Sequence, residues 1–307
     1  MSYSIAVILT VFNRRQKTLA CLEHLFMAQQ TYNSSHQPDE HVSLAVFLTD
    51  DGCTDGTAEA IHATFPSSDI RILKGTGSLF WAGGMRLAWQ NAIDSAESWD
   101  YYLLINDDTY FYPNLFQILF ETEQYCVKTF SRQGIYSGIT CSPDAEGEIT
   151  YGGEVYANWT KGRQILLQPT GSPQQADVVN ANILLIPQQV VSSLGIFHTG
   201  FTHSCADYDY SWKARRAGVP VLVTASVCGA CAYDHQNKQQ SAMMYRNMTL
   251  ADRLRQASRL TNSDRDYLLF VRRNLPLRYP VSWLVRKIRI YTPFLYYYIN
   301  KVRGLYK

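Results

Sequence analysis

The sequence predicts an α/β protein with a mostly parallel sheet covered by helices on both faces. In the first hundred residues, short apolar runs alternate with segments of helical periodicity, the pattern of parallel strands joined by helices. Polar clusters follow three of these runs directly, at residues 10–15, 50–55 and 106–109. Because ligands bind at the carboxyl ends of such strands, we expect the clusters to form one site.

Each element of this first part has a local reason. Apolar, β-branched runs predict four strands, at residues 5–10, 42–48, 70–73 and 101–105. Helical spacing predicts three helices between them, at residues 17–30, 55–65 and 84–96. Leu19, Leu22 and Phe26 share one face of the first helix, and Asp55 caps the second.

The later part of the chain is less regular. Residues 134–171 are rich in Gly, Thr and Tyr and predict strands and loops, with a hairpin around Gly147. The further expected elements are an apolar segment at 178–186, a helix at 206–217 that ends at Gly218, a strand at 219–223, and a helical, aromatic region from residue 267 onward.

Composition excludes some classes of protein. The chain has 307 residues, 46% hydrophobic, which is enough to bury a full core and excludes a disordered or disulfide-stapled chain. The net charge of +2 argues against a nucleic-acid-binding protein. That average hides a division: residues 272–307 hold nine Lys and Arg and no acidic residue, whereas residues 1–271 hold 19 basic and 26 acidic residues.

The ends and the cysteines indicate a cytoplasmic protein. We find no secretory signal and no apolar run of membrane-spanning length, and the seven scattered cysteines are typical of reduced thiols. Cys228 and Cys231 form a CxxC pair, but a zinc site needs further ligands at defined spacing. We expect two small buried thiols near the end of a strand.

The two common phosphate-binding loops are missing from the sequence. The first strand-to-helix turn, residues 10–15, has no glycine, and Gly75 and Gly77 lack a third glycine in register. No GxxxxGK[ST] motif occurs. The sheet is therefore expected to be Rossmann-like without either loop.

Three acidic clusters carry the chemical prediction. Asp50 and Asp51 follow the second strand, Asp107 and Asp108 follow the fourth, and Asp207 and Asp209 open a later helix. Adjacent carboxylates repel, so such pairs serve a cation, hydroxyl donors or a helix N-terminus. Any one cluster alone is more often a turn or a cap. Together, at the ligand edge of a sheet, they predict a site.

Five segments, in order, resemble the family 2 glycosyltransferases. Residues 8–14 resemble the opening strand of that family, and residues 49–57 (TDDGCTDGT) resemble its VDDGSTDGT motif with Cys53 in place of serine. Residues 77–86 (GSLFWAGGMR) resemble the G-aromatic-AGG segment of its rhamnosyltransferase-like branch. Residues 104–109 occupy the place of its DXD motif, and residues 206–218 resemble its ED-x-D element. The resemblance implies the GT-A fold and use of a nucleoside-diphosphate sugar, dTDP- or UDP-linked.

The resemblance also implies roles for individual residues. Asp207 is the implied catalytic base, with Asp209 as an alternative base or support; Asp108 is the implied metal ligand, with His235 as a further one. Phe12 is implied to lie against the base, Asp51 to accept a hydrogen bond from it, and Asp107 to hold the ribose. The implied nucleotide-sugar-binding residues are Thr10, Phe12, Asn13, Arg14, Asp51, Trp81, Arg86, Asp107 and Asn182.

Sugar transfer explains why these residue types are needed. Negative charge grows on the leaving diphosphate, and a divalent cation, Mn²⁺ or Mg²⁺, held by carboxylates offsets it. The acceptor hydroxyl loses a proton as it attacks, so a base is needed. One base without a covalent nucleophile implies direct displacement with inversion at the anomeric carbon.

The sequence departs from the family pattern at three positions. Asn106 stands at the first position of the DXD motif, Ala206 replaces the glutamate of the ED pair, and Lys213 stands where the branch tends to have arginine. Two alternatives therefore stay open. One is a nucleotidyltransferase, although the first turn has only Arg14 and Arg15 where that class has a Gly- and Arg-rich loop. The other is a catalytically decayed carbohydrate-binding or scaffold protein.

Two domains are expected. Residues 1–240 form the transferase domain, with a nucleotide-sugar-binding half at 1–110 and an acceptor-binding half at 111–240, and residues 241–307 form a helical, basic, aromatic extension. Its cations and tyrosines favour an anionic membrane surface, at the inner face of the cytoplasmic membrane, over a core helical cap or a homo-oligomer interface. The family implies a glycan or lipid-linked acceptor in bacterial surface polysaccharide synthesis.

Overall fold

The computed structural model describes residues 2–145, 147–158, 162–233, 238–259 and 263–302. The chain divides into two compact units. The first comprises Met1–Thr199 with Asp207–Tyr233, and the second comprises Gly200–Ala206 with Asp234–Lys307.

The first unit is built on a mixed sheet with the strand order β10-β13-β6-β12-β4-β1-β2-β3, with β5 paired to β13 and β7 paired to β6. Its strands are β1 (Tyr3–Val11), β2 (Val42–Asp50), β3 (Ile70–Lys74), β4 (Tyr101–Ile105), β5 (Tyr110–Phe111), β6 (Ile135–Cys141), β7 (Ile149–Tyr151), β10 (Gln174–Gln175), β12 (Ile183–Pro187) and β13 (Val221–Ala230). A smaller sheet joins β8 (Gly153–Asn158) to β9 (Arg163–Leu166) and β11 (Val178–Val179).

The sheet is parallel where the sequence predicts it. Strands β1, β2, β3 and β4 pair in parallel, with Thr10 opposite Thr49 and Ile8 opposite Leu104. Strand β12 then runs antiparallel to both β4 and β6. Its first residues therefore lie at the edge where β1, β2 and β4 end, which brings the segment before β12 to the predicted ligand edge.

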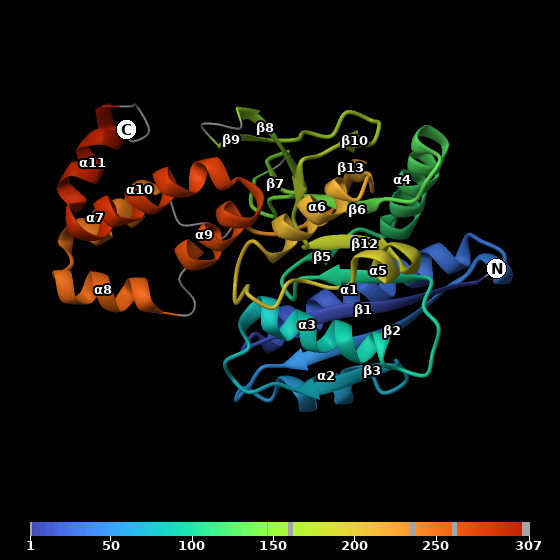
Figure 1. Ribbon diagram of the computed structural model, residues 1–307. Coiled ribbons are helices and arrows are strands. Elements are labelled where there is room, and N and C mark those ends of the chain that lie inside the picture. The colour runs from blue at the N-terminus through green and yellow to red at the C-terminus, as the bar shows by residue number, and fades with distance from the viewer. Residues whose placement is uncertain (1, 146, 159–161, 234–237, 260–262, 303–307) are drawn as a thin grey trace. The chain divides into compact units, whose positions relative to one another are not determined.

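Helices cover both faces of the sheet, as Figure 1 shows. The helical elements of the first unit are α1 (Arg15–Ser34), η1 (Pro38–Glu40), α2 (Thr57–Thr64), α3 (Phe80–Ile93), α4 (Leu115–Phe130), α5 (Gln188–Leu194) and α6 (Ala206–Arg216), of which Ala206 belongs to the second unit. On one face, Ile5, Val7 and Leu9 of β1 pack in one buried cluster with Leu22 and Phe116 of α1 and α4. Alternate β1 residues point to the other face, toward α3.

Helix α3 approaches the sheet closely because Gly84 faces it. A Cβ on Gly84 would lie 2.1 Å from Thr10 Oγ1, and the carbonyl of Gly84 accepts a hydrogen bond from Thr49 Oγ1 at 2.8 Å. Gly83, next to it, is buried, and a Cβ there would lie 3.1 Å from Leu79 Cβ, just before the helix. The AGG segment is thus the contact between this helix and the sheet.

Several predicted boundaries were wrong. Helix α3 begins at Phe80, four residues before the predicted start, because the cap on its N-terminus comes from Asp51, far away in sequence. The apolar segment at 178–186 is split between β11 and β12 by the turn at 180–182. Strand β13 extends to Ala230, because its later residues pair with β6 and β5 through bulges.

The second unit is helical. Its elements are α7 (Lys238–Asn247), α8 (Leu250–Ser258), α9 (Ser263–Asn274), η2 (Pro276–Arg278), α10 (Tyr279–Tyr291) and α11 (Pro293–Val302). Buried Asp266 of α9 accepts backbone hydrogen bonds from Thr202, His203 and Ser204, which joins the 200–206 segment to this unit. None of the helices that the structure describes is long and apolar enough to cross a bilayer.

Candidate active site

Asp107 and Asp108 lie together where β4 ends. Asp107 is buried and the Asp108 side chain is 14% exposed. Arg14, which follows β1, places Nη1 3.3 Å from Asp107 Oδ1 and 2.8 Å from Asp108 Oδ2. Lys17 Nζ of α1 lies 3.9 Å from Asp108 Oδ2. The structure therefore brings the first and third predicted polar clusters together around a carboxylate pair.

Asp107 is the more constrained member of the pair. Burial raises its pKa to about 6, with a contribution from the neighbouring Asp108 charge, while Arg14 acts in the opposite direction. Its Oδ2 is buried and has no hydrogen-bond partner among the described residues. A buried, unpartnered carboxylate oxygen costs stability, so it marks a place where a ligand would be accommodated.

Asp51 holds the loop that enters α3. It is buried; its Oδ1 accepts a hydrogen bond from Gly77 N at 2.8 Å, and its Oδ2 accepts one from Phe80 N at 2.9 Å. Phe80 has a φ of 53°, which is rare for a bulky residue, so the Asp51 carboxylate holds a strained turn. Gly75 is required beside it, because a Cβ there would lie 2.6 Å from Asp51 Oδ1.

Thr10 and Phe12 differ in their surroundings. Thr10 lies beneath α3, where its Oγ1 donates to Thr49 O at 3.3 Å. Phe12 is 56% exposed at the end of β1, although it is a large aromatic residue. An exposed ring at the ligand edge of the sheet offers a face on which a nucleobase can stack.

Asn13 joins the first two loops of the site. Its φ is 51°, in the left-handed region that asparagine tolerates. Its Oδ1 accepts hydrogen bonds from Thr54 N at 2.7 Å and Thr54 Oγ1 at 3.3 Å, and its backbone N–H donates to Cys53 Sγ at 3.2 Å. The TDDGCTDGT segment is therefore held against the loop that carries Phe12 and Arg14.

Trp81 links α3 to the carboxylate pair. Its Nε1 donates to Asn106 Oδ1 at 2.8 Å, and its ring lies 5.6 Å from that of Phe197. Asn106, which takes the first DXD position, thus orients the tryptophan with its amide oxygen. Arg86, one turn further along α3, donates from Nη1 to His198 O at 3.2 Å.

Asn182, just before β12, reaches the same edge from another direction. It is buried, and its Nδ2 lies 3.4 Å from Cys231 Sγ. Cys231 Sγ in turn lies 3.8 Å from Asp108 Oδ1. Cys228 and Cys231 are both buried, at the end of β13.

Asp207 begins α6 and bonds to the turn before β12. Its Oδ2 accepts a hydrogen bond from Ala181 N at 3.3 Å, and its Oδ1 accepts one from Tyr208 N at 2.9 Å. Burial raises the pKa of Asp207 to about 6, although these hydrogen bonds lower it, and the charge of Glu154 raises it further.

Ala181 adjoins Asn182, so Asp207 and Asp108 are connected through one short turn and Cys231. Asp209 lies two residues further into the helix and is buried.

The donor set around Asp107 and Asp108 is compatible with a hard divalent cation. Carboxylate oxygens suit Mg²⁺ and Mn²⁺, which need only one or two such ligands when substrate phosphates and water complete the shell. Among the described residues, Asp107 Oδ2 has no hydrogen-bond partner and Asp108 Oδ1 lies near the Cys231 thiol, while Arg14 contacts the other oxygen of each carboxylate. Across the described residues, no three His, Cys, Asp or Glu side chains converge to hold a metal on their own. His235 lies outside the described residues.

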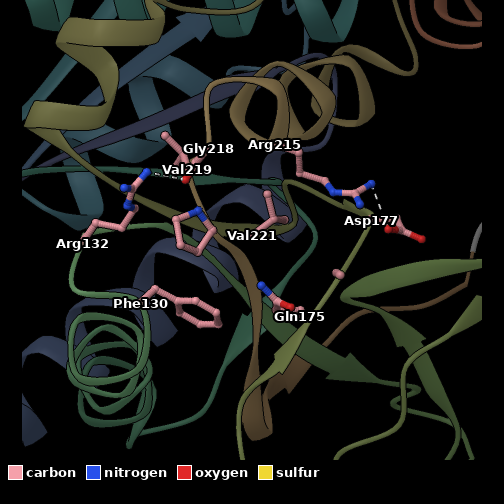
Figure 2. A pocket seen from close by; sticks show the side chains of 10 residues that line it. Phe130, Arg132, Gln175, Asp177, Arg215, Gly218, Val219 and Val221 are labelled. Carbon is pink, nitrogen blue, oxygen red and sulfur yellow. Dashed lines mark hydrogen bonds and ion pairs between the residues drawn. The ribbon is translucent and has the colours of Figure 1, made fainter.

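A separate pocket of about 440 Å³ lies at the other end of β13. Figure 2 shows Arg132, Arg215 and Asp177 among its lining residues, with Phe130 at its base. Arg132 donates to Gly218 O at 3.0 Å, and Arg215 pairs with Asp177 at 2.8 Å. The pocket begins at Val221, ten residues before Cys231, which at about 3.3 Å per strand residue places it on the order of 30 Å from the carboxylate pair. It is therefore not part of the acidic site.

Sequence reasoning missed three neighbours of the acidic residues. Lys17 and Cys231 adjoin Asp108, and Glu154 on β8 adjoins Asp207 through Tyr208, whose hydroxyl donates to it at 2.9 Å. The CxxC pair did draw attention to Cys231 as a small buried thiol near the end of a strand, which it is, but not to its contact with Asp108. Nothing local in the sequence marks Glu154, because its position depends on how β8 pairs with β9 and β11.

Comparisons with known proteins establish the fold. No protein-family model and no curated protein sequence matches the chain. The mannosyltransferase PcManGT from Pyrobaculum calidifontis, solved in complex with GDP-Man and Mn²⁺, aligns with 100% of this chain and 82% of its own, at 12% identity and a TM-score of 0.53. GalNAc-T7, solved with UDP, GalNAc and Mn²⁺, aligns with 77% of this chain and only 44% of its own, at 10% identity and a TM-score of 0.50. The chain thus has the α/β, GT-A-like fold seen in these glycosyltransferases.

Proposed function

We propose that this protein is a metal-dependent glycosyltransferase that transfers a sugar from a nucleoside-diphosphate donor to an acceptor hydroxyl with inversion. The observation that supports this best is the meeting of separate loops at one edge of the sheet. Arg14 contacts Asp107 and Asp108, Trp81 contacts Asn106, and all lie where parallel strands end. This is the edge at which α/β sheets bind nucleotides.

The site offers side chains suited to the base, the diphosphate and the ribose of such a donor. Phe12 offers a ring face to the base, while Arg14 and Lys17 offer positive charge to a diphosphate. Asp107 and Asp108 would hold a divalent cation, and the sequence resemblance suggests that Asp107 would also hold the ribose. When bound, the cation supplies positive charge that offsets the negative charge growing on the leaving diphosphate.

Asp207 is the proposed base. A carboxylate with a pKa of about 6 is ionised at neutral pH yet accepts a proton more readily than an ordinary aspartate. It is held by the Ala181 and Tyr208 backbone N–H groups, so its orientation is fixed before substrate arrives. Asp209 is the alternative.

The finer assignments rest on sequence resemblance. We propose that the chain belongs to family 2, on the five resembling segments, and to its rhamnosyltransferase-like branch, on residues 77–86, with a dTDP- or UDP-linked donor. The proposed acceptor is a hydroxyl of a glycan or lipid-linked intermediate in bacterial surface polysaccharide synthesis. The proposed site of action is the cytoplasm, with residues 1–240 as the transferase domain.

A thermal-shift screen of sugar nucleotides with and without Mn²⁺ tests this proposal. A ligand that binds only the folded state raises stability by about 2.7 kcal/mol at one hundred times its Kd, so the best donor gives the largest rise in Tm. We expect one nucleotide class to stabilise the protein, and more strongly with Mn²⁺.

Matched variants assign the effect to the site. Asp108→Asn is expected to remove the Mn²⁺-dependent part of the shift. Asp94→Asn, an exposed carboxylate at the far end of α3, is expected to keep it. If nucleoside triphosphates stabilise the protein and sugar nucleotides do not, a nucleotidyltransferase becomes the better reading. A protein that binds donors but never consumes them would be a decayed transferase.

A further inference from the structure

Helix α10 turns an apolar face to solvent. Val281, Leu284 and Val285 are 64%, 53% and 42% exposed, and with Ile288 they follow the i, i+3, i+4, i+7 spacing of one helix face. Leu277, just before the helix, is 95% exposed. A water-facing helix surface of this kind normally carries charged or polar side chains.

Helix α11 repeats this arrangement. Its buried positions are Pro293 and Asn300. Its exposed side chains are almost all apolar or aromatic, namely Phe294, Leu295, Tyr298, Ile299 and Val302. Single exposed apolar side chains are normal on a protein surface, but these two consecutive helices expose many of them. Groups of exposed apolar side chains mark an interaction surface.

Two arginines lie on the more enclosed side of α10. Arg289 and Arg286 both reach Asp264 of α9, with Arg286 Nε 3.8 Å from its Oδ2, and Arg286 also donates to Ala257 O at 2.9 Å. These guanidinium groups fix the inner face of α10 to the unit. The outward apolar face is therefore held in place rather than exposed by a loosely attached helix.

The sequence around these two helices is strongly basic. Residues 241–307 contain fourteen Lys and Arg but only three Asp and no Glu. All three aspartates are engaged: Asp264 with the two arginines, Asp266 with backbone N–H groups, and Asp252 with Thr249 and Arg255. Little negative charge is left to offset the cations.

Aromatic residues lie beside the cations. Lys287 Nζ lies 5.3 Å from the ring of Trp283 and 5.7 Å from that of Tyr291. Trp and Tyr next to Lys and Arg, around an apolar stripe, are typical of helices that lie in the interface of a bilayer. Each cation near an anionic lipid surface adds about 1 kcal/mol of attraction.

We propose that the exposed faces of α10 and α11 bind the surface of an anionic lipid bilayer, with the helices lying in the interface. A nucleic acid would satisfy the cations but would leave the aliphatic stripes in water. A second copy of the chain would place like charges against each other. The surface belongs to the second unit alone, so the proposal does not depend on the transferase chemistry.

The test is co-sedimentation of the full chain with vesicles of phosphatidylcholine alone or mixed with phosphatidylglycerol. We expect binding to the mixed vesicles at least about tenfold tighter than to phosphatidylcholine alone, and weaker binding at high salt. The double variant Leu284→Asp, Leu295→Asp is expected to lose at least about tenfold in affinity. Val127→Asp on α4, which changes a residue of similar exposure in the first unit, is expected to bind as the parent chain does.

Further measurements separate folding and self-association from lipid binding. Leu284→Gln adds no charge and is expected to weaken vesicle binding while the unfolding midpoint stays within a few degrees. Hydrogen exchange is expected to slow in α10 and α11 when vesicles are added. The proposal fails if the parent chain ignores anionic vesicles, or if the aspartate variants bind them unchanged. It also fails if those variants instead convert a dimer into a monomer.

Discussion

The guanidinium of Arg14 is ion-paired with the carboxylate of Asp108, with Nη1 2.8 Å from Oδ2. The same nitrogen lies 3.3 Å from Asp107 Oδ1. The Arg14 side chain is 44% exposed, whereas the two carboxylates are largely enclosed. With Lys17 nearby, this exposed arginine therefore offsets the charge of a largely enclosed acidic pair at the mouth of the proposed donor site.

Arg14→Gln tests what this ion pair does. Removing the guanidinium takes a positive charge away from the carboxylates, so we expect Mn²⁺ to bind the donor-free protein about three- to tenfold more tightly. The donor diphosphate loses a cationic contact, so its affinity is expected to fall. Calorimetric titration measures both.

Arg15→Gln is the matched control, because Arg15 Nη1 contacts the backbone of Asp55 rather than the acidic pair. It is expected to leave both affinities within about twofold. Weaker Mn²⁺ binding by Arg14→Gln would show that the arginine supports the cation site instead of competing with it.

The pKa of Asp207 is expected to set the pH dependence of transfer. The base must be ionised to accept a proton, so kcat is expected to fall as the pH drops through about 6. Asp207→Asn is expected to lower kcat by about 10²- to 10⁴-fold while the Kd for the donor changes little. Rate measurements between pH 5 and pH 8 report the first effect, and donor titration reports the second.

Glu154 refines that prediction. Its negative charge helps to raise the pKa of Asp207, so Glu154→Gln is expected to move the acidic limb of the kcat profile to lower pH. Glu148→Gln, which changes an exposed carboxylate in the turn before β7, is expected to leave the profile in place. If Glu154→Gln leaves the pH of the acidic fall in kcat unchanged, or if Asp207→Asn keeps full activity, Asp207 is not the base.

We expect the Phe12 ring to contribute to donor binding but not to the stability of the fold. Stacking of a base on an aromatic ring contributes about 1–3 kcal/mol, so Phe12→Ala is expected to raise the donor Kd by roughly 5- to 150-fold. Because the ring is 56% exposed, the unfolding midpoint is expected to change little. Tyr125→Ala, at an exposed aromatic residue on α4, serves as the control; equal effects of the two variants would exclude stacking on Phe12.

The close packing of α3 on β1 requires glycine at position 84. Alanine ordinarily favours a helix over glycine by about 1 kcal/mol, but a Cβ here would lie 2.1 Å from Thr10 Oγ1. We expect Gly84→Ala to destabilise the fold by about 2–4 kcal/mol, measured by urea unfolding. Adding Thr10→Ala is expected to recover part of this loss. A Gly84→Ala protein as stable as the parent would mean that α3 does not pack this closely.

The sequence was most informative where periodicity and strand ends decide the structure. The alternation of strands and helices and the ligand-edge position of residues 10–15, 50–55 and 106–109 are features of local pattern, and the structure shows them. The start of α3 was missed because its cap, Asp51, belongs to another loop. Glu154 was missed because strand pairing, rather than local spacing, brings it near Asp207.

In residues 241–307, the sequence could not predict which face of each helix is buried. Charge and aromatic content identified the region, but the sequence pattern alone does not say which helix face is buried. Only the Asp264 pairs reveal that Arg286 and Arg289 face inward while Val281 and Leu284 face solvent. The usual expectation of polar residues outside and apolar residues inside would have reversed these assignments.

The central claim is sugar transfer from a nucleoside-diphosphate donor, and the most direct measurement follows both products of that donor in one reaction. The parent chain, Mn²⁺ and the donor found by thermal shift would be incubated with an acceptor preparation, and phosphorus and proton NMR would identify the nucleotide and the anomeric configuration of the product. We expect one nucleoside diphosphate per sugar transferred, inverted configuration, and loss of both products in Asp207→Asn despite donor binding. Release of pyrophosphate, or a donor left intact by the parent chain, would contradict it.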